Sequence, residues 1–309
     1  MKHPIRIFVA SKGDPVGMAQ AFRAELPGAD VITDIALVGT DPVPFIVVGK
    51  PDPGVIASVP GLQLVLSLNA GVEHLLASGE VPPHLPVARM VDPAMTMGMS
   101  DWVLAVVLSW HRNLALYRAD PVWTRRDERL SQDRTVTVLG AGVLGGRVGQ
   151  LLALVGFQTR VWSRSATPVA GATAFGGADG LIEATTGADV VVNLLPLTPA
   201  THDILAAPLF ARMATGGLVV NAGRGGHLVD GDLIAALDTG QIGAAALDVF
   251  RTEPLPETDP LWRHPLVLVT PHVAAPTQPG SAIRVMAENI RRFQRGEALH
   301  DLVDRNHGY

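Results

Sequence analysis

The stretch TVTVLGAGVLGGRVGQLLALVG, residues 135–156, decides the fold of this chain. Its first five residues are apolar or β-branched, as in a buried strand, and a GxGxxG pattern follows directly. Behind the last glycine of that pattern, apolar residues recur at the spacing of one helical face: Val148, Leu151, Leu152 and Val155. Gly156 then ends the expected helix. A strand, a glycine loop and a helix in this order are typical of the turn that binds the phosphates of a dinucleotide.

Each glycine of this loop has its own expected role. Gly140 permits the tight turn, Gly142 lets the backbone approach a pyrophosphate, and Gly145 lets the helix pack closely on the strand. The helix N-terminus supplies N–H groups and a positive dipole for the anion. The cofactor-binding residues predicted here are Gly140, Gly142, Val143, Leu144 and Gly145. The alternative is a structural turn with incidental glycines, since glycine makes up 32 of the 309 residues.

The end of the next strand indicates which nicotinamide cofactor is preferred. NAD-binding proteins usually carry Asp or Glu about 20 residues after the loop, where it accepts from the ribose 2′-OH. Here the strand ends in Ser163, Arg164 and Ser165, without an acid. Arg164 can pair with a 2′-phosphate, to which the serine hydroxyls can donate. The sequence therefore predicts a preference for NADP(H). The alternative is NAD(H), with Arg164 stacked on the adenine.

Short apolar runs continue on both sides of this stretch at the spacing of βα units. Around it we expect six strands, over residues 135–139, 159–162, 190–194, 218–220, 244–249 and 266–269. Three earlier runs, over 5–10, 45–48 and 64–68, predict a second parallel sheet. We therefore expect an α/β protein of two domains: a doubly wound Rossmann cofactor domain over 100–280, and a smaller flavodoxin-like substrate domain. The substrate domain would combine residues 1–99 with 281–309, through a last helix over 281–295.

A strongly apolar helix is expected to begin near the start of the cofactor domain. Ser100 can cap this helix, and Asp101 favours its positive end. The residues 102–110 are apolar on nearly every side. Such a helix is buried either between layers of one chain or between two subunits, and periodicity does not separate these alternatives.

Three polar residues follow three of the predicted strands. Arg224, Glu253 and His272 lie in segments just past the apolar runs 217–220, 244–247 and 266–269. Groups at the carboxyl ends of neighbouring parallel strands converge on one crevice. A guanidinium fork can bind a carboxylate and polarise a carbonyl, an imidazole can donate a proton near neutral pH, and a carboxylate can orient that imidazole. Together, after a dinucleotide loop, they predict catalysis of hydride transfer. Taken singly, each residue has an ordinary structural interpretation.

Composition narrows the remaining classes of protein. Hydrophobic residues make up 48% and charged residues 17% of the chain, which argues for a large core and against disorder. The net charge of −5, without a basic stripe, gives no indication of a nucleic-acid partner. There is no cysteine, and the histidines show no paired ligand spacing, so we expect no metal site. No run is long enough to span a membrane, and we expect a cytoplasmic protein.

The segments around the glycine loop and after these strands resemble the D-isomer-specific 2-hydroxyacid dehydrogenases, above all the NADPH-preferring glyoxylate/hydroxypyruvate reductases of bacterial type A. The matching segments are 140–145, 162–165, 193–201, 221–225, 247–254 and 271–272. The resemblance implies reduction of a small 2-oxo acid to the D-2-hydroxy acid with NAD(P)H. Arg224 would bind the substrate, Glu253 would orient His272, and His272 would be the acid/base. It also implies a homodimer built on the helix near Ser100.

The resemblance implies further site residues. Backbone amides of Ala70, Gly71 and Val72 would bind the substrate carboxylate together with Arg224, and a turn before a helix is suited to an anion. Further cofactor contacts would come from Leu195, Pro196, Thr201, Ala222, Gly223, Asp248, His272 and Ala274.

One departure from the family and two rival functions remain. The type A reductases carry an aromatic residue in a loop of the first domain where this chain reads Val48-Gly49-Lys50-Pro51. Lys50 would either attract a second anionic group of the substrate or be solvated. One rival is a redox-sensing corepressor-like protein that binds the dinucleotide without turnover. The other is a formate-type dehydrogenase, which has Gln in place of Glu253.

Overall fold

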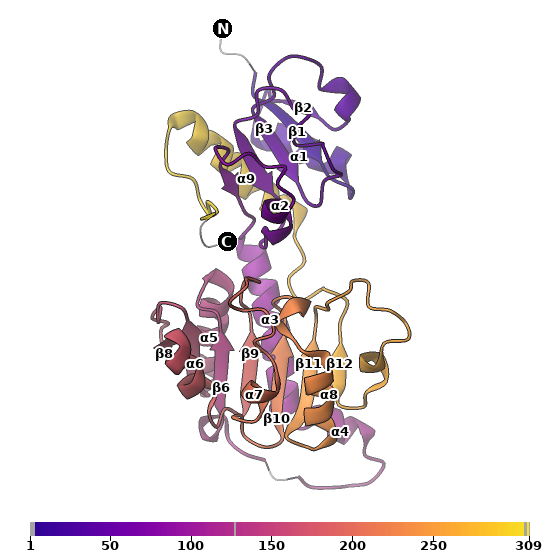
Figure 1. The fold of residues 1–309 in the computed structure, drawn as a ribbon, viewed down its shortest axis with the longest axis vertical. Helices are drawn as coiled ribbons and strands as arrows, with labels where there is room; N and C mark the ends of the chain where they lie inside the picture. Colours follow the sequence, from indigo (N-terminus) through magenta and orange to yellow (C-terminus); the bar gives the residue numbers. More distant parts are fainter. Residues whose placement is uncertain (1–3, 127, 306–307, 309) are drawn as a thin grey trace. The chain divides into compact units, whose positions relative to one another are not determined.

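The computed structural model describes residues 4–126, 128–305 and 308 (Figure 1). The chain divides into two compact units, Met1–Met95 with Thr277–Tyr309, and Thr96–Pro276. The boundaries predicted from the sequence lie a few residues away. Each unit contains a parallel sheet with helices, so the predicted α/β class is confirmed.

The first unit has a five-stranded sheet in the order β2-β1-β3-β4-β5, with parallel pairing throughout. Its strands are β1 (Arg6–Ala10), β2 (Asp30–Ile32), β3 (Phe45–Val48), β4 (Leu64–Ser67) and β5 (Val87–Ala88). This is the flavodoxin-like order. The sequence predicted β1, β3 and β4. It missed β2 and β5, because two or three residues carry no readable periodicity.

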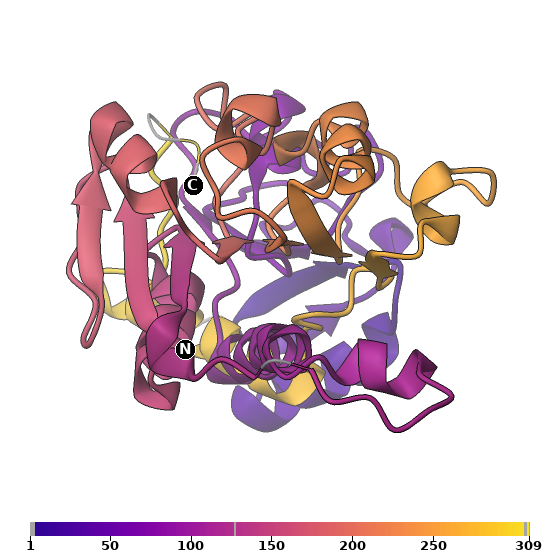
Figure 2. The same ribbon diagram turned by 90° about the horizontal axis from the view of Figure 1, so that it is seen from below.

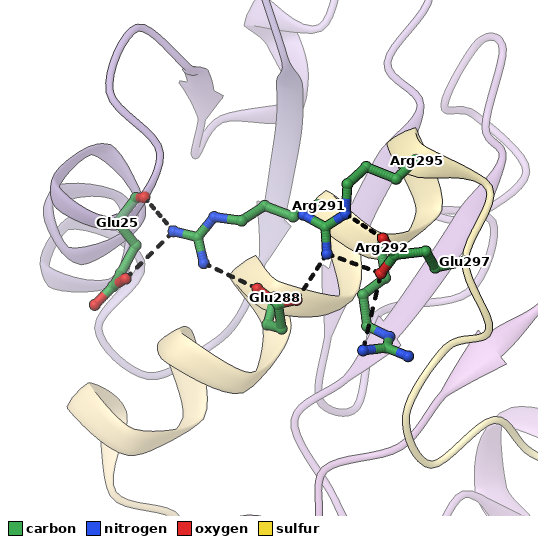
Figure 3. Close-up of polar contacts among 6 residues, drawn as sticks. All are labelled: Glu25, Glu288, Arg291, Arg292, Arg295 and Glu297. Carbon is green, nitrogen blue, oxygen red and sulfur yellow. Dashed lines mark hydrogen bonds and ion pairs between the residues drawn. The ribbon is translucent and has the colours of Figure 1, made fainter.

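In the described part of the first unit, the sheet is joined by helical segments, the last of which returns from the C-terminal end of the chain. They are α1 (Pro15–Glu25), the 3₁₀ turn η1 (Ile35–Leu37), α2 (Glu73–Ala77) and α9 (Pro279–Arg295). Arg291 of α9 donates to the backbone oxygen of Glu25 in α1 (2.6 Å) and pairs with Glu288 on its own helix (3.4 Å). Figure 3 shows how Arg295 extends this chain of charges from Glu288 to Glu297. The contact of Arg291 with Glu25 attaches α9 to α1.

The second unit has a seven-stranded parallel sheet in the order β12-β11-β10-β9-β6-β7-β8. Its strands are β6 (Thr135–Leu139), β7 (Gln158–Ser163), β8 (Thr173–Gly176), β9 (Val190–Asn193), β10 (Gly217–Asn221), β11 (Ile242–Leu247) and β12 (Val267–Val269). This is the Rossmann order extended by β12, and the strand order reverses between β6 and β9. All six predicted strands are present. β8 was missed, because it has only two consecutive apolar residues, none of its residues is fully buried, and glycines end and follow it.

Helices cover both faces of this sheet. They are α3 (Pro93–His111), α4 (Leu114–Ala119), α5 (Val143–Val155), α6 (Gly177–Thr185), α7 (Ala207–Phe210) and α8 (Asp230–Asp238), with 3₁₀ turns η2 (Ser131–Asp133), η3 (Gly225–His227) and η4 (Pro260–Arg263). Successive strand residues point to opposite faces: Val190 and Val192 pack with residues of α3 and α5, whereas Val191 packs with residues of α6, α7 and α8. Figure 2 views α3 nearly end-on.

The predicted start of α3 at Ser100 is wrong. The helix begins at Pro93, and the carboxylate of Asp92 accepts from the backbone N–H of Met95 (2.8 Å). Proline fits the first helical position, where its missing N–H is not needed. Ser100 lies inside the helix and donates to the backbone oxygen of Thr96 (2.7 Å). Among the described residues, no helix is both long and apolar enough to cross a membrane.

A segment rich in exposed apolar side chains follows α3. Its exposed large side chains are Leu114, Leu116, Val122, Trp123 and Leu130. Trp123 is 95% exposed. A polar network orders the segment, in which the Tyr117 hydroxyl donates to Glu128 (2.9 Å) and Arg112 pairs with the same carboxylate (2.9 Å). Several exposed large apolar side chains in one segment are typical of a segment that contacts another protein.

The buried histidine at the end of α3 predicts a loss of stability in acid. His111 is 3% exposed, and its Nδ1 accepts from Arg134 (3.1 Å). Burial first, and then Arg134, lowers its pKa below the ordinary value of 6.5. Below pH 6.5, His111 is therefore protonated in the unfolded chain while it is still neutral in the folded protein. The free energy of unfolding consequently decreases as the pH falls. We expect a His111→Gln variant to lose less of its melting temperature than the wild type between pH 8 and about pH 5. Equal slopes of melting temperature against pH would contradict this.

Candidate active site

The glycine loop has the geometry that the sequence predicts for Gly140 and Gly145. Gly140 has a φ of 110°, and a Cβ there would lie 2.9 Å from the backbone oxygen of Leu194. A Cβ at Gly145 would lie 2.0 Å from the backbone oxygen of Gly140. Gly142 precedes α5, and a Cβ there would meet open space. The approach of a phosphate to Gly142 remains a prediction that this geometry permits.

The predicted face of α5 needs one correction. Val148 and Leu152 are fully buried, but Val155 is 40% exposed, because α5 ends there and Gly156 follows with a φ of 106°. Gly149 takes the remaining place on this face, since a Cβ there would lie 2.8 Å from the Val161 side chain.

A hollow of about 440 Å³ opens beside the start of α5. Its lining residues are Ala141, Gly142, Val143, Gly146, Arg147, Gln150, Pro168, Val169 and Ala170. The volume is in the range of small-molecule pockets. The first N–H groups of α5 have no partner within the helix, as at every helix start, and so favour an anion here. Loop, hollow and helix start therefore fit a dinucleotide phosphate.

The residues predicted to select the cofactor form a turn at the end of β7. The Ser163 hydroxyl accepts from the backbone N–H of Thr167 (3.0 Å), and the hydroxyls of Ser165 and Thr167 lie 3.1 Å apart. Arg164 lies within this turn and is exposed. The turn adjoins the glycine loop, because the Gly140 N–H donates to the backbone oxygen of Trp162, one residue before the turn (2.8 Å).

Glu253 and His272 are in direct contact. Nδ1 of His272 lies 2.8 Å from Oε2 of Glu253, and Oε1 of the same carboxylate accepts from the Phe250 N–H (2.9 Å). Because a carboxylate accepts, Nδ1 carries the proton in this pair, and Nε2 is the ring nitrogen directed away from it. The His272 side chain is 54% exposed. The predicted orientation of an imidazole by a carboxylate agrees with this geometry.

Asp248 has a positioning role that sequence reasoning missed. It is 1% exposed, and its carboxylate accepts from the Thr270 hydroxyl (2.6 Å) and from the N–H groups of Val273 and Ala274 (both 2.9 Å). These donors flank His272, whose own N–H donates to the Asp248 backbone oxygen (2.9 Å). Asp248 thus fixes the segment that carries the imidazole. Its predicted contact with the nicotinamide, and that of Ala274, remain predictions.

Arg224 lies three residues beyond the end of β10, and the sheet continues from β10 to β11 and then to β12. The carboxyl ends of these three strands lead to Arg224, to Glu253 and to His272, so all three emerge at one edge of the sheet. The Arg224 side chain donates to the backbone oxygen of Gly223 (2.6 Å), and its backbone oxygen accepts from the Asn221 amide (3.1 Å). The predicted convergence of these residues at one edge agrees with the strand order.

The other predicted cofactor contacts lie at the ends of β9 and β10. The Ala222 N–H donates to the backbone oxygen of Asn193 (3.2 Å), and the Gly223 N–H donates to the Asn221 side chain (3.2 Å). The Thr201 hydroxyl donates to the backbone oxygen of Pro196 (2.7 Å), which closes the loop after Leu195. Sequence reasoning missed the buried amides behind this loop, Asn193 and Asn221. Asparagines at the same position of adjacent strands were the available signal.

The predicted substrate loop belongs to the first unit. Ala70, Gly71 and Val72 lie between β4 and α2, and Val72 is fully buried. The backbone oxygen of Gly49 accepts from the Asn69 amide (3.3 Å) and lies 2.8 Å from Nε2 of His74. The loop is thereby joined to the neighbouring turn with the exposed Lys50.

Nowhere among residues 4–126, 128–305 and 308 do three or more histidine, cysteine or acidic side chains gather to hold a metal ion.

Comparisons with known proteins agree with this arrangement. The family model for the NAD-binding domain of D-isomer specific 2-hydroxyacid dehydrogenases matches residues 104–274. Glyoxylate/hydroxypyruvate reductase A of Serratia proteamaculans is 39% identical over 295 residues, covering 93% of this chain and 91% of the relative. The Klebsiella pneumoniae protein of the same name is 38% identical over 98% of this chain and 99% of its own.

Solved structures of similar proteins contain the predicted cofactor. A D-isomer specific 2-hydroxyacid dehydrogenase from Xanthobacter autotrophicus, in complex with NADPH and MES, aligns with a TM-score of 0.93 and 37% identity over 99% of this chain and 100% of that one. An NADPH-dependent glyoxylate/hydroxypyruvate reductase from Sinorhizobium meliloti, in complex with NADP and sulfate, aligns with a TM-score of 0.91 and 36% identity over 98% and 99%. The resemblance noted in the sequence is confirmed, and this chain belongs to the D-isomer specific 2-hydroxyacid dehydrogenase family.

Proposed function

We propose that this protein is an NADPH-dependent reductase that converts a small 2-oxo acid, of the glyoxylate or hydroxypyruvate kind, into the D-2-hydroxy acid. The observation that carries the proposal is the 2.8 Å contact of Glu253 with His272, at the sheet edge to which Arg224 also leads. Relatives named glyoxylate/hydroxypyruvate reductase A support the substrate class.

The chemistry follows from the three side chains. NADPH, when bound, supplies the hydride that forms the new C–H bond at the carbonyl carbon. The Arg224 guanidinium binds the carboxylate and lies against the carbonyl oxygen, where its charge stabilises the developing alkoxide. His272, protonated on Nε2, donates that proton to the alkoxide and becomes neutral, while Glu253 stabilises the charged ring before transfer.

In this proposal Arg224 binds the substrate carboxylate, and the backbone amides of Ala70, Gly71 and Val72 are assigned to the same group. Lys50 lies in the turn joined to that loop through Gly49, so its charge is available to a second anionic group. Longer, doubly anionic oxo acids therefore belong in any substrate test.

NADP(H) is the preferred cofactor in this proposal. Three similar structures contain NADPH or NADP, and the turn after β7 offers the Arg164 guanidinium and no acid to a 2′-phosphate. NAD(H) remains usable, because the glycine loop binds the part that both cofactors share. The residues assigned to the cofactor are those of the glycine loop, the 163–165 turn, the loop after β9, and the segments after β10, β11 and β12.

We expect Arg164→Ala to lower kcat/KM for NADPH by about 10- to 100-fold and to leave that for NADH nearly unchanged. A hydrogen-bonded contact with a charged group contributes about 1.5–3 kcal/mol, and only NADPH carries the 2′-phosphate. Initial rates with both cofactors at a saturating 2-oxo acid measure the ratio. Arg164→Lys, which keeps the charge without the fork, should lie between. Equal losses with both cofactors would assign Arg164 to the adenine instead.

The assembly in this proposal is a homodimer in the cytoplasm. The exposed apolar side chains of residues 114–130, together with α3, supply the surface that a second copy would cover. Sedimentation equilibrium measures the state directly, and a monomer at micromolar concentration would contradict it.

A panel assay tests the proposed function as a whole. NADPH and NADH oxidation is followed with glyoxylate, hydroxypyruvate, pyruvate, bulkier 2-oxo acids and dianionic 2-oxo acids. Turnover with NADPH and at least one small 2-oxo acid is expected. Tight NADPH binding without turnover on any of them would favour the redox-sensing alternative, whereas oxidation of formate would favour the formate-type enzyme.

A further inference from the structure

A fully buried histidine lies three residues after Arg224 and has no part in the proposed chemistry. His227 ends η3, and none of its surface is exposed. We propose that His227 is a positioning residue: as a neutral imidazole protonated on Nε2, it fixes the backbone of Arg224 through Nδ1 and the loop at Pro196 through Nε2. One ring would thus align the substrate-binding arginine with the cofactor-side loop. This inference rests on the proposed function for the roles of these two segments.

Two backbone groups determine the tautomer of His227. The N–H of Arg224 lies 3.1 Å from Nδ1, and a backbone N–H can only donate. The backbone oxygen of Pro196 lies 3.2 Å from Nε2, and a carbonyl can only accept. Nδ1 is therefore the unprotonated ring nitrogen, and Nε2 carries the proton. An imidazolium would direct an N–H of its own at the N–H of Arg224, so the buried ring stays neutral.

A buried amide pair extends the contact on the Arg224 side. The Asn193 amide nitrogen donates to Nδ1 of His227 (2.8 Å) and to the Asn221 side-chain oxygen (2.9 Å). The Asn221 amide in turn donates to the backbone oxygen of Arg224 (3.1 Å). Arg224 is thereby held at its backbone N–H by His227 and at its backbone oxygen by Asn221. Such a network orients its members closely, since each unpaired buried group costs free energy.

On the other side of the ring, Nε2 of His227 contacts the loop after β9. The Pro196 backbone oxygen accepts from Nε2 of His227 and from the Thr201 hydroxyl (2.7 Å). The same hydroxyl accepts from the backbone N–H of Thr198 (2.9 Å). Loss of the Nε2 donor removes one of these two contacts at the Pro196 carbonyl and loosens the loop that would contact the nicotinamide ribose.

Close packing keeps the ring in this orientation. A Cβ at Gly223 would lie 2.8 Å from the Asn193 amide nitrogen and 3.0 Å from Nδ1 of His227. A Cβ at Gly226 would lie 3.0 Å from the Leu197 side chain. The absence of a side chain at Gly223 therefore lets this ring and Asn193 approach the backbone closely, and Gly226 leaves room for Leu197 of the loop after β9.

Two amide variants, each of which keeps one of the two contacts of the ring, separate the two halves of the proposal. In His227→Asn, the side-chain oxygen replaces Nδ1 and the Nε2 donor is lost. In His227→Gln, the amide nitrogen replaces the Nε2 donor and the Nδ1 acceptor is lost. We expect His227→Gln to raise KM for the 2-oxo acid about tenfold with NADPH affinity nearly unchanged. We expect His227→Asn to weaken NADPH binding about tenfold with the 2-oxo acid KM nearly unchanged. If His227 only stabilised the fold, one variant would not affect the 2-oxo acid KM alone while the other affected the NADPH affinity alone.

The measurements are steady-state kinetics for KM and kcat, and fluorescence titration for NADPH affinity. Parallel changes of both constants in both variants, or wild-type constants in both, would overturn the proposal. If the wild type binds NADPH but reduces no 2-oxo acid, the proposed function fails, and the NADPH titrations still test the Pro196 half.

Nuclear magnetic resonance of the wild type covers the case in which both variants fail to fold. The imidazole nitrogens of His227 can be assigned through contacts with the Arg224 amide. Their signals should show a protonated Nε2 and an unprotonated Nδ1. Both should stay unchanged between about pH 6 and pH 8, the range in which a free histidine changes charge. The opposite tautomer, or a titration in that range, would overturn the proposal.

Discussion

Replacement of His272 is expected to lower kcat by about 10² to 10⁴, the usual contribution of a positioned acid, with little change in NADPH affinity. The reason is the geometry of its ring: Glu253 binds Nδ1 at 2.8 Å, which leaves Nε2 as the atom that can deliver a proton. His272 also has a φ of 55°, in the left-handed region that asparagine tolerates better than alanine. Both His272→Asn and His272→Ala should therefore be measured, by single-turnover NADPH oxidation and by NADPH titration.

The pair of variants separates the loss of the acid from backbone strain. Both should lose turnover to a similar extent, because neither side chain can donate a proton at neutral pH. A large loss in His272→Ala with near wild-type turnover in His272→Asn would show that strain, and not acid catalysis, explains the effect. Glu253→Gln serves as the matched control: it keeps a hydrogen-bonding group beside Nδ1 but removes the charge, so we expect a smaller loss than for either His272 variant.

The fold was readable from the sequence wherever an element is long and regularly patterned. The stretch 135–156 alone identified β6, the glycine loop and α5, and the neighbouring strands followed at regular spacing. The failures have a common physical cause. β2, β5 and β8 are short and each contain only two consecutive apolar residues, so their strand conformation depends on pairing with a neighbour rather than on a pattern of their own.

The start of α3 was misplaced for a different reason. Ser100 and Asp101 form a good cap by composition, but capping residues are tolerated inside a helix when the serine hydroxyl donates to the preceding turn, as Ser100 does to Thr96. Asp92 with Pro93 was the competing signal, and it lies eight residues earlier in a stretch without apolar periodicity.

In the candidate site, too, residues that follow a readable sequence pattern were predicted, and residues without such a pattern were missed. The contact of Glu253 with His272 could be predicted because each follows an apolar run, and parallel strands bring such positions together. Their catalytic roles, and that of Arg224, stay predictions. The residues that fix these side chains in place could not be predicted. Asp248 receives its donors from the segment after β12, and His227 contacts Asn193 from β9, more than 30 residues away. Contacts of this kind depend on strand order and side-chain direction, neither of which a spacing reveals.

Arg224→Ala is expected to lower kcat/KM for the 2-oxo acid by roughly 30- to 5,000-fold while NADPH still binds. Loss of one partner of a desolvated, hydrogen-bonded charge pair costs about 2–5 kcal/mol, and 1.4 kcal/mol corresponds to a factor of ten. The backbone contacts of Arg224 with His227 and Asn221 do not involve its side chain, so the loop should keep its position in the variant. Steady-state kinetics with glyoxylate and hydroxypyruvate, beside NADPH titration, measure both effects.

The methyl ester of the same oxo acid gives the decisive comparison, because it lacks the carboxylate that Arg224 would bind. The wild type should prefer the acid strongly over the ester, and Arg224→Ala should lose most of that preference by losing activity on the acid. Arg224→Lys keeps the charge but not the two-pronged geometry, so it should recover only part of the loss. A variant that retains both the wild-type kcat/KM and the wild-type preference for the acid would exclude Arg224 from substrate binding.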